Sequence, residues 1–346
     1  MPHLVIATTA VDHPMGAQVY EEEIASRAAG VLDGWEIDRV VVRSLRSALA
    51  GNRRLPFNHL ARAPRQVRQL AGRVIYPRAA LVHRMDLTLP PAPHELVTVH
   101  DAVAWKFPDE APPTPHAAVE VRRAVGVICP SSFSAEEAVE VLGVHEPYVI
   151  PNGVDERFLQ AVPASPEQRQ ELGIPGGRYV LHAGGSSTRK NLEGLAAAWP
   201  IVRQARPDVT LVMSGPPSHR RDRLFGPLDG VVRIGRVANA AMPGLLAAAQ
   251  VVVVPSTYEG FGLPALEAMA VGVPVVAANR SSLPEVCGDA AVLTEPDGPA
   301  LAEGLLDVLE GGSSLTTLTR RGRERAAEFT WDRSAHEHAA LWRRLS

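Results

Sequence analysis

The feature that most constrains this chain is a repeated alternation of short apolar runs with longer segments of helical spacing. The first run begins at His3, and residues 19–29 and 134–142 have helical patterns. Strands that alternate with helices predict βαβ units and a parallel sheet. Ser134 and Glu137 predict a capping box at the start of the second helix. In the first half the apolar runs are 3–7, 36–42, 79–84, 96–100, 125–129 and 148–153.

The same alternation restarts after a loop-rich stretch between Pro163 and Gly177, which we predict to be a linker. The run VVVVPS at 251–256 is apolar on both faces, as a central parallel strand is. We therefore predict two doubly wound, Rossmann-like α/β domains, with ligands beyond the carboxyl ends of the strands and in a cleft between the domains. The other runs are 178–185, 209–215, 231–235, 273–278 and 290–294, and helices are expected at 192–204, 240–249, 264–271 and 300–310.

Composition narrows the class of protein. With 346 residues the chain is long enough for roughly two domains, and 46% hydrophobic residues suffice for their cores. Two cysteines, Cys129 and Cys287, exclude a disulfide scaffold and a cysteine-rich zinc site, and they are typical of a reducing compartment. The first residues lack the basic segment of a signal peptide, and no apolar stretch approaches the roughly 20 residues of a membrane span. We expect a cytoplasmic protein.

The loop that follows the VVVVPS run combines glycines with two glutamates. Gly260 and Gly262 let the backbone approach a ligand, and a helix expected from Pro264 offers free N–H groups to a phosphate. Glu259 and Glu267 can accept hydrogen bonds from vicinal hydroxyls, so this loop suits a sugar beside a phosphate. The alternative is a structural strand–loop–helix in which Glu267, in the first helical turn, only interacts with the helix dipole.

A second glycine-rich loop, HAGGSSTRKN at 182–191, lies between an apolar run and a helix expected from about Asn191. Its N–H groups, with Arg189 and Lys190, could hold a diphosphate. The loop is not a Walker loop, because Arg stands at 189 and Asn at 191. The alternative is a pair of solvated cations at the start of a helix.

His100 follows the LVTVH run and is expected at the carboxyl end of a strand. A buried structural histidine is the alternative to a functional one. His336 and His338 are expected on an exposed face of the last helix. The sequence contains no Asp-x-Asp triplet and no His-Glu-x-x-His or Gly-x-Ser-x-Gly motif, so we expect no metal site and no serine hydrolase.

Nine arginines and no Asp or Glu lie from Arg43 to Arg78. Helical spacing places Arg62, Arg65 and Arg68 on one face. An anionic partner, either a phosphorylated acceptor or the inner face of a membrane in peripheral contact, is one interpretation. A solvated basic face is the favoured alternative, because only two of the 35 basic residues are lysines and arginine is abundant throughout. Without interleaved aromatic residues, we expect no nucleic acid partner.

EGFGLPALEAMA places seven residues between Glu259 and Glu267, and it closely resembles the E-x7-E region of the family-4 retaining glycosyltransferases, which have the GT-B fold. The next segment, GVPVVAANRSSLPEVCGDAAVL, also resembles that family. PNGVDERF resembles its domain junction, VVRIGRV its nucleotide strand and FTW at 329–331 the start of its C-terminal helix. The match is dense from about Pro130 to Trp331 and thin before His100.

This resemblance implies an acceptor domain over 1–160, a nucleotide-sugar domain over 161–329 and a helix over 330–346 that returns to the first domain. Lys190 matches the family lysine that holds the donor diphosphate. Gly185 stands where the family often has an arginine, and Arg189 is expected to compensate. The resemblance also assigns Glu259 to the sugar hydroxyls, Glu267 to the ribose and His100 to a position facing the donor sugar. The other donor-binding residues it implies are Gly16, Gly185, Ile234, Gly260, Phe261, Gly262 and Leu263.

The activity implied is that of a retaining hexosyltransferase that needs no metal and no cofactor. It would move a hexose, with mannose weakly favoured, from a nucleotide diphosphate sugar to a hydroxyl of a sugar, lipid-linked or natural-product acceptor. A GT-B-like sugar-nucleotide epimerase, a phosphorylase and a non-catalytic sugar-nucleotide binder are the alternatives.

Overall fold

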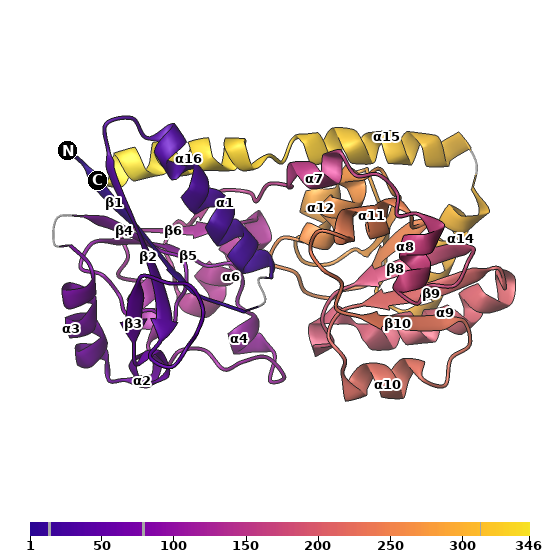
Figure 1. The fold of residues 1–346 in the computed structure, drawn as a ribbon, viewed down its shortest axis with the longest axis horizontal. Coiled ribbons are helices and arrows are strands. Elements are labelled where there is room, and N and C mark those ends of the chain that lie inside the picture. Colours follow the sequence, from indigo (N-terminus) through magenta and orange to yellow (C-terminus); the bar gives the residue numbers. More distant parts are fainter. Residues whose placement is uncertain (13–14, 78–79, 312) are drawn as a thin grey trace. The chain divides into compact units, whose positions relative to one another are not determined.

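The computed structural model describes residues 1–346 except 13–14, 78–79 and 312, and it forms two compact units (Figure 1). Unit 1 comprises Met1–Gly153 with Trp331–Ser346, and unit 2 comprises Val154–Thr330. The sequence placed the first boundary later, between residues 160 and 161. It lies earlier because Val154 already pairs with Thr330 and Phe158 packs in the core of unit 2.

Unit 1 is built on a parallel sheet of seven strands among the described residues. The apolar runs of the first half all form strands, while the short edge strand β3 was not predicted. The winding direction reverses between β1 and β4, as in a doubly wound fold. The order across the sheet is β3 (Arg53–Leu55), β2 (Glu36–Ser44), β1 (His3–Thr9), β4 (Leu81–Arg84), β5 (Glu95–Thr98), β6 (Gly126–Cys129) and β7 (Tyr148–Val149).

Unit 2 repeats this topology with a parallel sheet of six strands in the part of the chain described. Counted within the unit the strand order is 3-2-1-4-5-6, with the reversal between β8 and β11. The predicted fold class, two doubly wound α/β domains, is confirmed. The order across the sheet is β10 (Val231–Gly235), β9 (Val209–Ser214), β8 (Arg178–Ala183), β11 (Val251–Val254), β12 (Val275–Ala278) and β13 (Val292–Thr294).

Helices connect the strands of each unit, and in unit 1 the last helix of the chain lies along the first (Figure 1). None of the helices in the described ranges is long and apolar enough to cross a lipid bilayer. Unit 1 contains α1 (Gly16–Val31), α2 (Phe57–Arg62), α3 (Arg65–Ile75), α4 (Val103–Lys106), α5 (Ala117–Val121), α6 (Ser132–Leu142) and α16 (Trp331–Leu345). Unit 2 contains α7 (Glu156–Leu159), α8 (Pro166–Glu171), the single turn η1 (Thr188–Lys190), α9 (Leu192–Ala205), α10 (His219–Phe225), α11 (Met242–Ala247), α12 (Leu263–Ala270), α13 (Leu283–Cys287), α14 (Gly298–Glu310) and α15 (Ser313–Ala327).

The start of α6 corrects one local prediction. The helix is capped by Ser131, whose Oγ accepts from the N–H of Ser134 at 3.0 Å. The predicted capping box of Ser134 and Glu137 is therefore wrong, because the helix begins a turn earlier. Glu137 instead forms an ion pair with Lys106 at 2.6 Å.

A continuous chain of buried hydrogen bonds fixes α16 to the sheet of unit 1. An indole N–H can only donate and a carbonyl can only accept, so the two ends of the chain determine the direction of every bond between them. The bonds run from Trp342 Nε1 to His83 Nδ1 (3.3 Å), from His83 Nε2 to Thr98 Oγ1 (2.8 Å), from Thr98 Oγ1 to Tyr20 Oη (2.9 Å), from Tyr20 Oη to His338 Nε2 (2.7 Å) and from His338 Nδ1 to the Ser334 carbonyl (2.7 Å).

Both imidazoles of this chain are therefore neutral, each with one protonated nitrogen. Burial lowers the pKa of His338 to about 4 and holds that of His83 well below its usual value. The prediction that His336 and His338 share an exposed face is wrong for His338, which is completely buried. Two residues along a helix turn the side chain by about 200°, so only His336 faces solvent.

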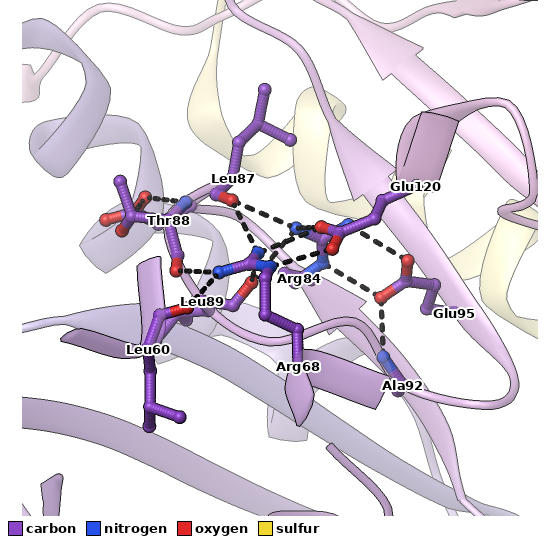
Figure 2. A network of polar contacts seen from close by, with 10 residues as sticks. Leu60, Arg68, Arg84, Leu87, Thr88, Leu89, Ala92, Glu95 and Glu120 are labelled. Carbon is purple, nitrogen blue, oxygen red and sulfur yellow. Dashed lines mark hydrogen bonds and ion pairs between the residues drawn. The ribbon is translucent and has the colours of Figure 1, made fainter. Parts of the chain in front are cut away.

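A network of buried charges lies beneath α3 (Figure 2). Arg68 donates to both carboxylate oxygens of Glu120, at 2.7 and 2.9 Å, and Arg84 makes the same paired contact with Glu95, at 2.9 Å each. The two pairs are linked, because Arg84 Nη1 lies 3.6 Å from Glu120. Arg68 also donates to the carbonyls of Leu60, Leu87, Thr88 and Leu89.

This network corrects the prediction that Arg62, Arg65 and Arg68 form one basic helical face. Arg62 ends α2 and Arg65 begins α3, so they belong to different helices, and Arg68 is fully buried. Arg78, the last of the nine arginines, lies outside the described residues.

We expect Arg68→Met to lower the free energy of unfolding by about 3–5 kcal/mol, because it leaves the Glu120 carboxylate buried without its paired donor. Arg73→Met is the matched control, since Arg73 lies on the same helix but is exposed. It should change stability by less than about 0.5 kcal/mol. Denaturant unfolding of both variants measures the difference, and equal effects would contradict a structural role for Arg68.

The neutral histidines predict a loss of stability in acid. An unfolded histidine takes up a proton near about pH 6.5, whereas in the fold the pKa values of His338 and His100 are lowered to about 4. The stabilisation is therefore complete above about pH 6.5 and is lost as the pH falls towards about 4, at about 1.4 kcal/mol per histidine and pH unit. The unfolding temperature of unit 1 should fall between about pH 7 and about pH 5.

The variant that checks this slope is His338→Gln, which removes one of the titrating groups. It should be less stable at neutral pH but should lose less of its stability on acidification. His336→Gln, on the exposed side of α16, should keep the wild-type slope. An unchanged slope in His338→Gln would show that the buried imidazole does not govern the acid response.

Candidate functional site

Three of the predicted site residues of unit 2, Arg189, Lys190 and Glu259, meet at the carboxyl ends of β8 and β11. These strands are neighbours in the sheet, and the winding direction reverses between them. A doubly wound sheet binds its ligands at such a switch point. Lys190 reaches this edge from the turn η1 after β8, and Glu259 reaches it from the loop after β11.

An ion-pair cluster joins these two segments. Lys190 Nζ lies 2.6 Å from Glu259 Oε1, and Arg189 Nη1 lies 3.3 Å from Glu259 Oε2. Lys190 is 9% exposed and Glu259 is 6% exposed. Two cations therefore share one carboxylate at the switch point, and the cluster has an excess of positive charge that suits an anion.

The charge state of Glu259 follows from two opposing effects. Burial raises the pKa of this carboxyl, but the charges of Lys190 and Arg189 outweigh burial and hold the pKa below its usual range. Glu259 is therefore ionised at neutral pH. Desolvation makes such a buried pair a weak source of stability, so its presence is more readily explained by binding than by folding.

Two serines hold the backbone of Glu259 in place. Its N–H donates to Ser281 Oγ at 2.9 Å, and its carbonyl accepts from Ser282 Oγ at 2.9 Å. Ser281 has a φ of 54°, in the left-handed region that residues other than glycine rarely occupy. Backbone conformations of this kind cluster at functional sites, where the surrounding structure maintains them.

Asn191 fixes the segment that carries Lys190. Its Oδ1 caps α9 by accepting from the N–H of Gly194, and its Nδ2 donates to the carbonyls of Pro255 and Pro296, at 3.0 and 2.6 Å. Its φ of 49° is also left-handed, a conformation that asparagine tolerates well. The bond to Pro255 ties η1 to the loop that carries Glu259, so the two charged side chains start from fixed positions.

Gly262 allows α12 to begin beside this cluster. Its φ is 104°, and a Cβ at this position would lie 2.9 Å from Leu283 Cδ2, so the site requires glycine. The helix starts at Leu263 rather than at Pro264, and Glu267 is its fifth residue. The expectation of Glu267 in the first turn is therefore wrong, and an interaction with the helix dipole no longer explains this glutamate.

Glu267 is half-buried, and desolvation raises its pKa to about 8. The nearby charges of Arg157 and Asp155, which flank the start of α7, act in opposite directions and have smaller effects. Glu267 is thus mostly protonated at neutral pH. A neutral carboxyl can donate one hydrogen bond and accept others, which suits a pair of neighbouring hydroxyls.

Arg221 on α10 is a site residue that sequence reasoning missed. It is 3% exposed and donates to the carbonyls of Gly184, Gly185, Ser214 and Pro216. Desolvation lowers its pKa. The side chain therefore fixes the carbonyls of the glycine-rich loop after β8 and places a buried cation against this loop. Its position in the first turn of a helix, where the dipole disfavours a cation, is the signal that could have indicated it.

The other predicted residues divide between the units. Ile234 is half-buried against the core of unit 2, and the ring of Phe261 packs edge-on against Phe329 at 5.7 Å, so Phe261 offers its backbone rather than its ring. Gly16 and His100 belong to unit 1. Gly16 is the exposed first residue of α1.

His100 lies beyond the end of β5, with its ring edge-on to Tyr20 at 4.8 Å. Burial lowers its pKa to about 4, so the imidazole is neutral at physiological pH. Its Nε2 is buried and has no hydrogen-bond partner among the described residues. A buried ring nitrogen is usually hydrogen-bonded, so the position of His100 is compatible with a functional role, which stays a prediction.

One cluster of possible metal ligands is found in the described residues, namely His3, Glu36 and Asp38. These residues lie at β1 and β2 of unit 1, whereas Lys190 and Glu259 belong to unit 2. The cluster is therefore no part of the charged site.

Comparison with known proteins finds a family similarity within unit 2. Residues 177–311 match the family model described as "Glycosyl transferases group 1". Over these residues unit 2 is similar to the group 1 glycosyltransferases. The matched residues contain the Lys190–Glu259 cluster, the glycine-rich loop and α12, which are the main parts of the candidate site in unit 2.

A curated relative matches part of the chain, and two solved structures share its fold. The O-antigen chain mannosyltransferase B of Escherichia coli is 39% identical to this chain over 173 residues, which cover 48% of this chain and 45% of the relative. The chain spans about half the length of the curated relatives it matches. Sucrose-phosphate synthase from Thermosynechococcus elongatus shares the fold with a TM-score of 0.77 at 22% identity, over 100% of this chain and 99% of that one. Anabaena HepE in complex with UDP-glucose shares it with a TM-score of 0.70 at 21% identity, over 98% of each chain.

We expect Glu267→Gln to stabilise unit 2 as the pH rises. A carboxyl whose pKa is raised from 4.5 to about 8 in the fold destabilises the protein increasingly between these two values, because only the unfolded chain can release the proton. Glutamine keeps the shape and removes the titration. Wild type and variant should therefore unfold at similar temperatures near about pH 5, and the variant should unfold at a higher temperature near about pH 8.

Glu303→Gln is the control, because Glu303 is exposed on α14. Its unfolding temperature should follow that of the wild type across the same range. If the Glu267→Gln curve also follows the wild type, burial does not keep Glu267 protonated.

Proposed function

We propose that this glycosyltransferase is a retaining enzyme that moves a hexose from a nucleotide diphosphate sugar to an acceptor hydroxyl. The observation that carries the proposal is the Lys190–Glu259 pair at the switch point of the sheet, with Arg189 on the same carboxylate. A diphosphate is the ligand class that compensates such an excess of cations, and a carboxylate beside it suits sugar hydroxyls. The resemblance to family-4 retaining glycosyltransferases supports retention of configuration.

In this proposal the bound donor replaces the contacts that Glu259 makes with Lys190 and Arg189. The diphosphate takes Lys190 and Arg189, and Glu259 turns to the hydroxyls of the sugar while Glu267 holds the ribose. Arg221 keeps the carbonyls of Gly184 and Gly185 pointing away from the phosphates, which leaves the N–H side of the loop to the donor. The resemblance adds His100 of unit 1, whose buried Nε2 has no hydrogen-bond partner among the described residues and is suited to a sugar hydroxyl.

The reaction breaks the bond between the anomeric carbon and the diphosphate oxygen and forms a bond from the acceptor oxygen on the same face. The acceptor proton passes to the leaving phosphate. Negative charge grows on that phosphate in the transition state, and Lys190 and Arg189 stabilise it there. We propose that these cations make a metal ion and any other cofactor unnecessary.

We further propose mannose or a related hexose as the sugar, supported by the similarity to the E. coli mannosyltransferase. UDP-glucose in the HepE complex supports the donor class but leaves the nucleotide of this enzyme open. A sugar, lipid-linked or natural-product acceptor is proposed on the same grounds. The cytoplasm is the proposed compartment, in keeping with two free buried cysteines.

Two alternatives give different products from the same site. A sugar-nucleotide epimerase would return an isomerised donor without transfer, and a non-catalytic binder would show affinity without turnover. Product analysis with a panel of nucleotide sugars separates all three, and binding is detected first as a rise in unfolding temperature.

We expect three variants to distinguish the roles of Lys190, Glu259 and Glu267 in donor binding and turnover. Lys190→Ala should lower kcat by about 10²–10³-fold and weaken nucleoside diphosphate binding, because it removes charge from the leaving group. Glu267→Ala should chiefly weaken binding of the free nucleoside diphosphate. Glu259→Ala should weaken only the intact donor, and the free diphosphate should bind as well as before or better, because Lys190 no longer has a competing partner. Calorimetry with diphosphate and donor, beside kcat, measures each effect.

Arg203→Ala is the control, since its ion pair with Asp229 lies at the surface of unit 2, and all parameters should stay at wild-type values. Equal loss of diphosphate binding in Glu259→Ala and Glu267→Ala would overturn the assignment of sugar to one and ribose to the other. Excess EDTA should leave turnover intact. Loss of turnover that Mg²⁺ or Mn²⁺ restores would overturn the proposal of metal independence.

A further inference from the structure

Helix α3 is packed with its apolar side outward. The fully or largely buried residues of this helix are Arg68 and Gly72. Val67, Leu70 and Val74 are 47%, 62% and 80% exposed. Their spacing of three and four residues places them on one stripe, which we call the outer stripe of α3. A helix of a water-soluble domain normally buries such a stripe.

Two contacts prevent α3 from turning this stripe inward. Arg68 is held by Glu120 and by four backbone carbonyls (Figure 2). A Cβ on Gly72 would lie 1.9 Å from the carbonyl oxygen of Pro91, so the helix backbone lies directly against that loop. Rotation would expose a paired buried arginine and replace Gly72 by a bulkier residue at the contact. The outer stripe is therefore a fixed feature of the surface.

Positive charge surrounds the outer stripe. Asp and Glu are absent between Asp38 and Asp86, so no acidic side chain interrupts this part of unit 1. Three arginines of the segment, Arg39, Arg68 and Arg84, have carboxylate partners. Among the described residues, no ion pair is found for the seven others, which are Arg43, Arg46, Arg53, Arg54, Arg62, Arg65 and Arg73.

We propose that the outer stripe of α3 docks on the surface of an anionic lipid bilayer. The apolar side chains enter the boundary between headgroups and acyl chains, and the arginines of α2, α3 and β3 contact lipid phosphates. Each arginine near an anionic surface strengthens binding, and a short apolar stripe supplies the shallow insertion that charge alone does not. Together these features match an interfacial helix rather than a spanning one.

The charge of this surface favours a lipid bilayer over the other possible partners. A second copy of the chain on the same face would bring two sets of unpaired arginines together, which is unfavourable. Nucleic acid would use the arginines but not an apolar stripe. An acidic protein partner fits the charge as well, and the experiment below distinguishes it from a bilayer. The inference does not depend on the transfer reaction, so either can fail while the other holds.

The test is flotation of the full-length protein with vesicles of phosphatidylcholine, with and without phosphatidylglycerol. We expect binding only to the anionic vesicles, and weaker binding as salt rises. A variant with Val67→Gln, Leu70→Gln and Val74→Gln should bind at least about tenfold more weakly. A variant with Arg54→Gln, Arg62→Gln and Arg73→Gln should bind about 100-fold more weakly.

All six changed residues are exposed, so both variants should keep the wild-type unfolding temperature. The controls are Val162→Gln, which is 78% exposed in unit 2, and Arg123→Gln, which is exposed in unit 1 outside the segment, and both should bind like the wild type. Failure to float with anionic vesicles would overturn the proposal and leave an acidic protein as the candidate occupant. Flotation that the apolar variant does not weaken would overturn docking through the stripe. A concentration-dependent dimer that this variant abolishes would assign the face to a second copy.

Discussion

The paired buried contact between Arg68 and Glu120 is the interaction on which much of unit 1 depends. It joins α3 to α5, and through Arg84 and Glu95 it extends to β4 and β5. Two guanidinium groups and two carboxylates compensate one another in a region that excludes water, so none of them can be removed cheaply. The same network determines which side of α3 faces solvent. A device for folding stability thus creates the apolar, basic surface of the domain.

Buried charges also meet at the switch point of unit 2, but there they do not balance. Lys190, Arg189 and Glu259 are also largely removed from water, yet they carry two positive charges against one negative charge. The Arg68 network is balanced, with two charges of each sign, whereas this cluster is not. The cluster lies at the edge of the sheet where the winding direction reverses, and its excess of positive charge is the basis of the proposal that an anionic ligand binds there. Left-handed Ser281 and Asn191 hold the exchanging groups in position.

The strand pattern and the glycine-rich loops could be inferred from the chain, because each depends on local order, whereas the roles of Lys190, Glu259 and Glu267 came from the family resemblance and stay predictions. Strands need only a short apolar run, and a loop after a strand falls at the carboxyl edge of the sheet wherever the strand lies. The cap of α6 and the place of Glu267 within α12 were wrong, since a helix boundary that moves by one residue or one turn reassigns every position after it. Arg221 was missed because its role consists only of contacts with distant carbonyls.

The sequence by itself determined two doubly wound domains and the glycine-rich loops of unit 2, because apolar periodicity and glycine placement act within a few residues. Only the tertiary structure decided which charges are buried. Arg68 and Glu120 are 52 residues apart, and His338 meets Tyr20 across 318 residues, so nothing near either residue indicates its partner. An arginine on a helix is solvated unless a carboxylate arrives from elsewhere in the fold. Because Glu120 pairs with Arg68, this arginine is buried rather than part of the predicted basic face. The same contact leaves the apolar side of α3 facing solvent.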